Sequence, residues 1–217
     1  MQQFQANLQT AIRSTIAANV QQPTVGAIAL RVVFDRQGKP LKCEAKTDSP
    51  KLSGMIPGNV MLTDATALAR TVTDACWKTI YPTAPEAMYS DKGTLEAIAP
   101  LGVRFDADPQ ARWPVRNAQR SFFRRHLLDE QQVSSVGVAV IRYQADATGK
   151  TTGCLVNLRA ASMRIADFKL DGALQSRLND ACMKLDLSQM PGFALNQQNQ
   201  AMGIVSLEYA PWTVGRP

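Results

Sequence analysis

The chain has 217 residues, of which 45% are hydrophobic, and its formal net charge is +6. This length allows one large domain or two small ones, and the hydrophobic share excludes a wholly disordered chain. No apolar run approaches the roughly 20 residues that a membrane-spanning helix needs, so we expect no transmembrane segment. No signal sequence is visible, and we expect it to be absent or removed.

The first half of the sequence predicts five elements in the order helix, strand, strand, helix, strand. We expect them, in chain order, at Gln3–Asn19, at Gly26–Asp35, around Cys43, at about Thr63–Ile80 and at Ile98–Phe105. Apolar residues alternate from Ile28 to Phe34, which gives the first strand one buried face, and Gly38 suits the hairpin turn that follows. Thr63 is the expected N-cap of the second helix.

The second half repeats this order. The corresponding elements are expected around Phe122–Leu128, at Val136–Ala145, around Cys154, at about Asp171–Leu185 and at Met202–Tyr209. Gly149 suits the hairpin turn and Asp171 the N-cap, and both long helices contain Asp-Ala-Cys followed one residue later by Lys. The sequence therefore predicts an α+β protein of two tandem α-β-β-α-β domains, at residues 1–109 and 115–217, each a small antiparallel sheet packed by two helices.

The four cysteines allow three disulfide pairings. Each half places one cysteine in the second hairpin strand and one on the apolar face of the following helix, which suits bridges Cys43–Cys76 and Cys154–Cys182. The alternative is four buried, reduced thiols in a cytosolic protein. Disulfides imply an oxidising compartment, which for a bacterial protein means the periplasm or the outside of the cell, and we expect the periplasm. Since the cysteines are widely spaced and His126 is the only histidine, we expect no metal site and no cofactor.

One hairpin carries a resemblance to a known family. Val33-Phe-Asp-Arg-Gln-Gly38, followed by Leu41-Lys-Cys43, is similar to the hairpin of the TonB and TolA carboxy-terminal domains, and the α-β-β-α-β order resembles theirs in both halves. The resemblance implies two tandem copies of that fold and a binding role without catalysis. TolA-like members carry a cysteine pair between sheet and helix, which the two pairs proposed above look like.

Positive charge is concentrated in the second half. Residues 1–109 carry a net charge of +1 and residues 110–217 a net charge of +5. Arg116, Arg120 and Arg124 recur every fourth residue and therefore share one face of a helix. This stripe is either a solvated face or a site for an anionic surface such as an acidic protein, lipopolysaccharide or anionic lipid. Nucleic acid is not expected, since aromatic side chains for stacking are sparse on that face.

Catalytic patterns are absent from the sequence. His126 has no serine, cysteine or paired carboxylate near it in sequence, and Thr148–Thr152 lacks the first glycine of a phosphate-binding loop. Asp106 and Asp108 lie together near a strand end, but calcium needs a further oxygen-rich segment, so a solvated loop is expected. We therefore expect no enzyme activity and no catalytic residues.

A sheet of few strands leaves an edge that can accept a strand from a partner. The sequence predicts a periplasmic interaction module that binds an envelope protein or peptide through such an edge, and the resemblance implies the same mode. The candidate partner-binding residues are Leu101, Val103 and Phe105 in the first copy and Ile204, Ser206 and Glu208 in the second. The alternatives are a structural subunit of an envelope-spanning secretion, conjugation or pilus assembly, and a periplasmic inhibitor or immunity protein.

Overall fold

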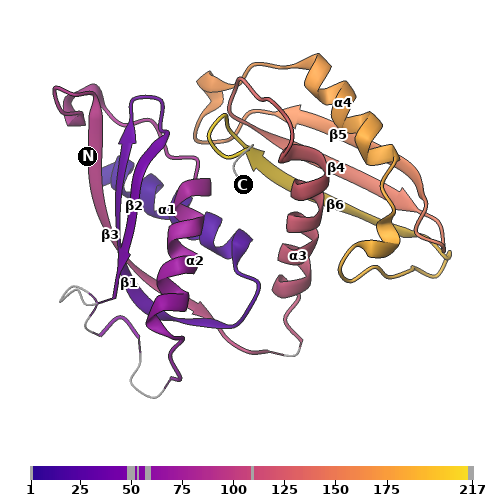
Figure 1. The fold of residues 1–217 in the computed structure, drawn as a ribbon, viewed down its shortest axis with the longest axis horizontal. Coiled ribbons are helices and arrows are strands. Elements are labelled where there is room, and N and C mark those ends of the chain that lie inside the picture. The colour runs from indigo at the N-terminus through magenta and orange to yellow at the C-terminus, as the bar shows by residue number, and fades with distance from the viewer. Residues whose placement is uncertain (1, 48–51, 53, 57–59, 109, 215–217) are drawn as a thin grey trace. The chain divides into compact units, whose positions relative to one another are not determined.

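The computed structural model describes residues 2–47, 52, 54–56, 60–108 and 110–214 (Figure 1). The chain divides into two compact units, Met1–Pro114 and Val115–Pro217. The first unit extends beyond the expected boundary at residue 109 because Trp113 packs on Phe105, with their ring centroids 5.3 Å apart. Among the helices of the described ranges, none offers the stretch of apolar residues that crossing a lipid bilayer requires.

The first unit has the expected α-β-β-α-β order. Its elements are α1 (Gln2–Asn19), β1 (Thr24–Asp35), β2 (Pro40–Lys46), α2 (Ala65–Lys78), a short 3₁₀ turn (Glu86–Met88) and β3 (Thr94–Phe105). The strands form an antiparallel sheet in the order β2-β1-β3. The N-cap of α2 is Asp64, whose side chain accepts from the backbone N–H of Ala67, and not Thr63 as expected. The Thr63 hydroxyl instead accepts the N–H of Val25 at the start of β1.

The second unit repeats this architecture. Its elements are α3 (Trp113–Phe123, whose first two residues belong to the first unit), a π-helical turn η3 (Arg124–Leu128), β4 (Gly137–Ala145), β5 (Thr151–Arg159), a 3₁₀ turn η4 (Ile165–Asp167), α4 (Gly172–Met183), a second 3₁₀ turn η5 (Leu187–Gln189) and β6 (Ala201–Tyr209). The sheet order β5-β4-β6 matches that of the first unit, and all pairings are antiparallel. Asp171 caps α4 as expected, accepting from the backbone N–H of Leu174. The predicted α+β fold of two such sheets is thus confirmed.

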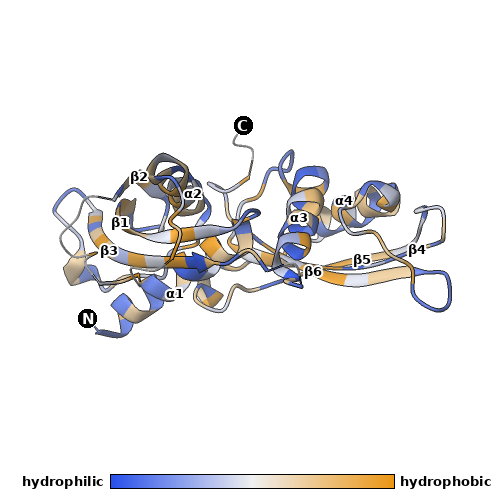
Figure 2. Cartoon of the chain, turned by 90° about the horizontal axis from the view of Figure 1, so that it is seen from below, coloured by the Kyte–Doolittle hydropathy of each residue, from blue (hydrophilic) through white to orange (hydrophobic). Residues whose placement is uncertain are grey.

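Both helices of each unit pack on the same face of its sheet. In the first unit, apolar residues of α1 and α2 share one core with alternate residues of β1 from Ile28 to Phe34. In the second unit, α3, η3 and α4 share a core with alternate residues of β4 from Ala139 to Ala145. The helices carry both hydrophobic and hydrophilic residues, as one-sided burial requires (Figure 2). Within the described residues, no α-helix of a unit packs on the other face of its sheet, called the uncovered face below, although Met55 and Ile56 approach it at Gly102 of β3.

Each unit contains the expected disulfide. Cys43 of β2 is bonded to Cys76 of α2, and Cys154 of β5 to Cys182 of α4, with Cα–Cα separations of 6.1 and 5.9 Å. Both helix cysteines are fully buried. The prediction of one bridge within each copy is confirmed, and the alternative of four reduced thiols is wrong. Two bridges of this kind fit an oxidising compartment.

One turn geometry occurs four times and marks the duplication in the backbone. In each turn the first and fifth residues are bonded through the backbone, and the first residue's side chain also accepts the fifth residue's N–H. The turns span Asp35–Lys39 and Asp146–Lys150 in the hairpins, and Ser90–Thr94 and Asn196–Gln200 before the last strands. The fourth residue has positive φ in all four turns and is glycine in three, but it is Asn199 in the last, with φ of 55°.

This difference predicts that Asn199→Gly stabilises the second unit. Glycine adopts positive φ without the steric cost of a Cβ, so the free energy of unfolding should rise by up to about 1 kcal/mol. Urea unfolding of the full chain measures it. Gln198→Gly, one residue earlier and without positive φ, should instead lower stability because it adds entropy only to the unfolded chain. An equal change in the free energy of unfolding for both variants would contradict a steric cost of positive φ at Asn199.

Candidate functional site

The residues tested for catalysis or metal binding have structural partners. His126 Nδ1 lies 2.8 Å from the carbonyl oxygen of Phe122, and its ring packs on that phenyl group at 4.4 Å. Asp106 pairs with Arg104, and Asp108 accepts the backbone N–H of Gln110. No cluster of three or more His, Cys, Asp or Glu side chains able to hold a metal ion occurs within the described residues.

The outer edge of β5 is closed by α4. The Asn179 side-chain oxygen accepts the backbone N–H of Val156 at 2.7 Å, and that of Gln175 accepts the N–H of Leu158 at 3.3 Å. In an antiparallel strand, alternate residues direct their backbone groups to the same side. These two amides therefore cover donors that an added strand would need, and β5 is a poor place for a partner strand to dock.

The outer edge of β3 is interrupted by Pro100. The backbone N–H and carbonyl of Val25 both bond to Thr63, which shows that odd-numbered β1 residues turn their backbone groups away from β3. Ala29 shares this direction and pairs with Pro100, so this pair has no ladder bonds. The backbone nitrogen of Pro100, which carries no hydrogen, thus faces the free edge. Proline at such a place weakens pairing with any further strand.

The outer edge of β6 is open along its middle. Arg124 donates from Nη2 to the carbonyl oxygen of Glu208 at 2.6 Å and from Nη1 to that of Thr213 at 3.3 Å. The Glu208 carbonyl therefore points away from β4, and by alternation so do the backbone groups of Met202, Ile204 and Ser206. In the described part of the chain these three residues have no further backbone partners on that side. This row, Met202 to Ser206, is named the β6 edge below.

The predicted partner-binding residues fall on two different faces. Leu101 and Val103 are 0% and 3% exposed and belong to the core, so their side chains cannot meet a partner. Phe105 is half-buried against Trp113. Ile204, Ser206 and Glu208 are exposed on β6, on the side of the sheet away from the helices. Sequence reasoning missed Met202, which shares their face and their edge.

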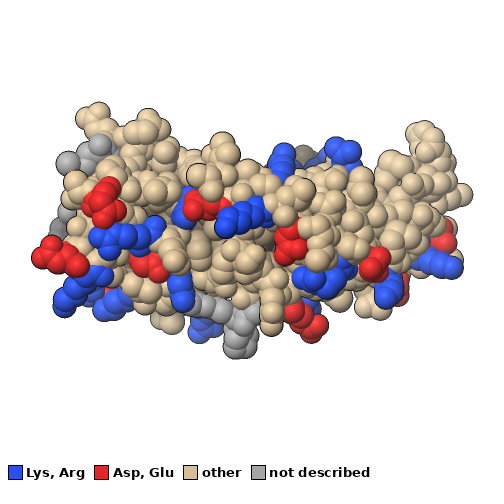
Figure 3. All heavy atoms as spheres, turned by 90° about the horizontal axis from the view of Figure 1, so that it is seen from above, with Lys and Arg blue, Asp and Glu red and all other residues tan. Residues whose placement is uncertain are grey.

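The predicted anion-binding stripe is divided among different roles. Arg116 is exposed, whereas Arg120 donates to the side-chain oxygen of Asn117 at 3.0 Å and Arg124 binds the two carbonyls described above. Desolvation lowers the pKa of Arg124, and it raises the pKa of Glu208 although part of that side chain remains exposed. On the face drawn in Figure 3, basic and acidic side chains are interspersed. Arg124 therefore acts on the end of β6 and not as part of a continuous anion site.

Comparison with protein-family models, curated proteins and solved structures finds no match to this chain. The features that bear on its function are thus the duplicated fold, the two disulfides, the β6 edge and the uncovered faces of the sheets.

Proposed function

We propose that the chain is a non-enzymatic interaction module of the bacterial periplasm that binds a strand of an envelope protein or peptide at the β6 edge. The unpartnered backbone groups of Met202, Ile204 and Ser206 are the observation that carries this proposal. The two disulfides support a periplasmic location. The resemblance of both halves to TonB and TolA carboxy-terminal domains supports docking through the last strand.

The size of the β6 edge sets what the partner must supply. Each backbone hydrogen bond contributes about 0.5–1.5 kcal/mol net, whereas association costs roughly 4–15 kcal/mol. Three residues of backbone pairing alone give weak binding. The exposed side chains of Met202 and Ile204 lie beside the edge and offer the additional apolar contact that a lasting complex needs.

The two copies differ at this edge by one residue. Ala29 lies six residues before Asp35 and pairs with Pro100, while Val140 lies six residues before Asp146 and pairs with Ser206. Pro100 and Ser206 are therefore equivalent positions. The first copy lacks a donor at the centre of its last strand and the second copy has one, which supports the second copy as the docking copy.

Ser206→Pro should abolish partner binding while leaving the sheet intact. The change removes an N–H that points away from β4, and the first copy already holds proline at this place. Co-purification from the envelope fraction of the native host, read by quantitative mass spectrometry, should show at least one protein reduced tenfold or more. Ser206→Ala is the matched control and should recover the same proteins as the unchanged chain. Equal recovery with Ser206→Pro would contradict docking at the β6 edge.

A further inference from the structure

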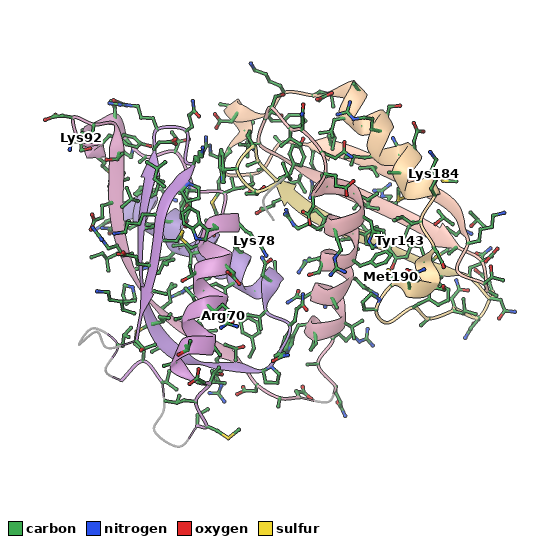
Figure 4. The ribbon with its side chains drawn as sticks, viewed as in Figure 1. Arg70, Lys78, Lys92, Tyr143, Lys184 and Met190 are labelled. Carbon is green, nitrogen blue, oxygen red and sulfur yellow. A yellow bond between two sulfur atoms is a disulfide. The ribbon has the colours of Figure 1, made fainter. Side chains whose placement is uncertain are left out.

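The uncovered face of each sheet has an arginine at the same place. Arg31 lies four residues before Asp35, and Arg142 lies four residues before Asp146, in the central strand of each unit. Tyr143, labelled in Figure 4, packs against Phe123 with ring centroids 5.1 Å apart on the helix-covered side of β4. Since successive side chains of a strand point to opposite faces, Arg142 lies on the uncovered side.

In the first copy this arginine is neutralised within its own sheet. Arg31 bonds Glu96 of β3 through Nε and Nη2, both at 2.8 Å, and Glu44 of β2 through Nη1 at 2.9 Å. Lys42 also pairs with Glu44, at 2.7 Å. The hydrogen bonds from Lys42 and Arg31 lower the pKa of Glu44, and the bond from Arg31 lowers that of Glu96. Both carboxylates therefore stay ionised, and the face is a compensated ladder of charges.

In the second copy both carboxylates are replaced by apolar residues. Leu155 of β5 pairs with Arg142 and is the counterpart of Glu44, which pairs with Arg31. Met202 of β6 pairs with Gln144 and is the counterpart of Glu96, which pairs with Val33. Arg142 is exposed and forms no ion pair with any residue that the structure describes. Around it, Leu155, Met202 and Ile204 are 48%, 57% and 65% exposed. These four residues are named the Arg142 patch.

The Arg142 patch combines three exposed aliphatic side chains with an exposed arginine, which is unusual for a sheet face that only contacts water. Single exposed aliphatic residues are ordinary, but a contiguous group of them around an arginine indicates an interaction surface. A partner that covers the patch must bring a carboxylate, because a guanidinium buried without one loses its hydration uncompensated. The first copy illustrates the pairing, with a carboxylate held by two parallel bonds from the equivalent arginine.

We propose that the Arg142 patch is the docking surface for an amphipathic helix of a partner protein, which brings one Asp or Glu to Arg142 and aliphatic side chains to Leu155, Met202 and Ile204. One observation and one general rule of packing favour a helix. The opposite face of the same sheet is already packed by helices, and an apolar helix stripe is the usual complement of a sheet face. The acid on that stripe is required by charge complementarity with Arg142.

A displayed library of one stable helical scaffold, randomised on one face, tests this proposal. It is selected on the intact, disulfide-bonded chain, and the selected helices are then assayed on the Leu155→Glu/Met202→Glu variant, which copies the first unit's carboxylates and gives Arg142 internal partners; this variant should bind them at least tenfold more weakly. We expect the selected helices to carry one Asp or Glu among aliphatic residues. Changing that acid to its amide should weaken binding at least tenfold, and Arg142→Gln should remove the difference.

A double variant of the first copy provides a matched gain-of-function test. Glu44→Leu/Glu96→Met recreates the Arg142 patch around Arg31 and should add a second site for the same helices. All the changed side chains are at least partly exposed, so thermal unfolding should show that both double variants fold. Helices that bind the Ser206→Pro variant as well as the unchanged chain would separate this surface from the β6 edge.

Four results would overturn the proposal. They are recovery of no binding helices, binders without an acid, binders indifferent to Leu155→Glu/Met202→Glu, and self-association of the chain that this double variant abolishes. The last of these, measured by sedimentation at several concentrations, would assign the patch to a second copy of the chain.

Discussion

Removing either disulfide should lower the stability of its own unit by about 3–4 kcal/mol. The bridges join residues 33 and 28 positions apart, and loops of this length restrict the unfolded chain by about that free energy. A domain of this size is stable by only about 5–15 kcal/mol, so the loss is a large share of the total. Guanidinium unfolding of Cys43→Ala/Cys76→Ala and of Cys154→Ala/Cys182→Ala measures it.

Each of these two cysteine double variants is the control for the other. Because each bridge lies within one unit, each variant should shift the unfolding of that unit and leave the other where it was. Dithiothreitol added to the unchanged chain should reproduce both shifts together. A midpoint insensitive to dithiothreitol would mean that the bridges contribute nothing to stability.

Gly149→Ala should destabilise the second unit by about 2–5 kcal/mol. Gly149 has φ of 87°, and a Cβ there would meet the backbone of Ser188, whose Cα would lie 2.7 Å away. Positive φ costs roughly 1–2 kcal/mol for alanine, and overpacking adds about 1–3 kcal/mol because backbone cannot move aside as a flexible side chain can. The carbonyl of Gly149 also accepts the N–H of Leu187, so any shift of the turn disturbs η5 as well.

Thermal unfolding of Gly149→Ala beside Gly172→Ala provides the comparison. Gly172 opens α4 without positive φ, and a Cβ there meets nothing within 4 Å. Its replacement by alanine should leave stability unchanged or raise it by up to about 1 kcal/mol. If the two variants unfold at the same temperature, the contact between the hairpin turn and η5 is not what holds this region.

The element order and the disulfides were predictable because their signals are local and occur twice. Alternation in β1 and β4, glycine in the turns and the Asp-Ala-Cys segments each appear in both halves. The cap of α2 was missed for a tertiary reason. Thr63 and Asp64 are both good capping residues. Asp64 is the cap because the Thr63 hydroxyl accepts the backbone N–H of Val25, which is far away in sequence.

The candidate site was less predictable, because it depends on which way the backbone faces. Leu101 and Val103 continue the alternation that begins at Leu95, and that pattern marks the core and not a partner surface. In β6, apolar residues occupy both faces, so alternation alone does not separate Ile204 from Val205. The difference between Pro100 and Ser206 acquires meaning only once the register with β1 and β4 is known.

The role of Arg124 lay beyond any pattern in the sequence. Its four-residue spacing from Arg120 suggested a shared charged face. Its position instead depends on the return of the chain after β6, which brings the carbonyls of Glu208 and Thr213 to the end of α3. Contacts between residues more than 80 positions apart are set by the topology of the unit.

Each disulfide also limits how far its unit can be drawn out under tension. With the bridges closed, a pull on the two ends of the chain cannot extend the segments 43–76 and 154–182, because the load passes through the sulfur atoms. At roughly 3.3–3.6 Å per residue, these locked segments withhold on the order of 100 Å from each unit. The maximum length to which the chain can be stretched is therefore smaller in its oxidised form than in its reduced form, and it depends on the redox state of the surroundings.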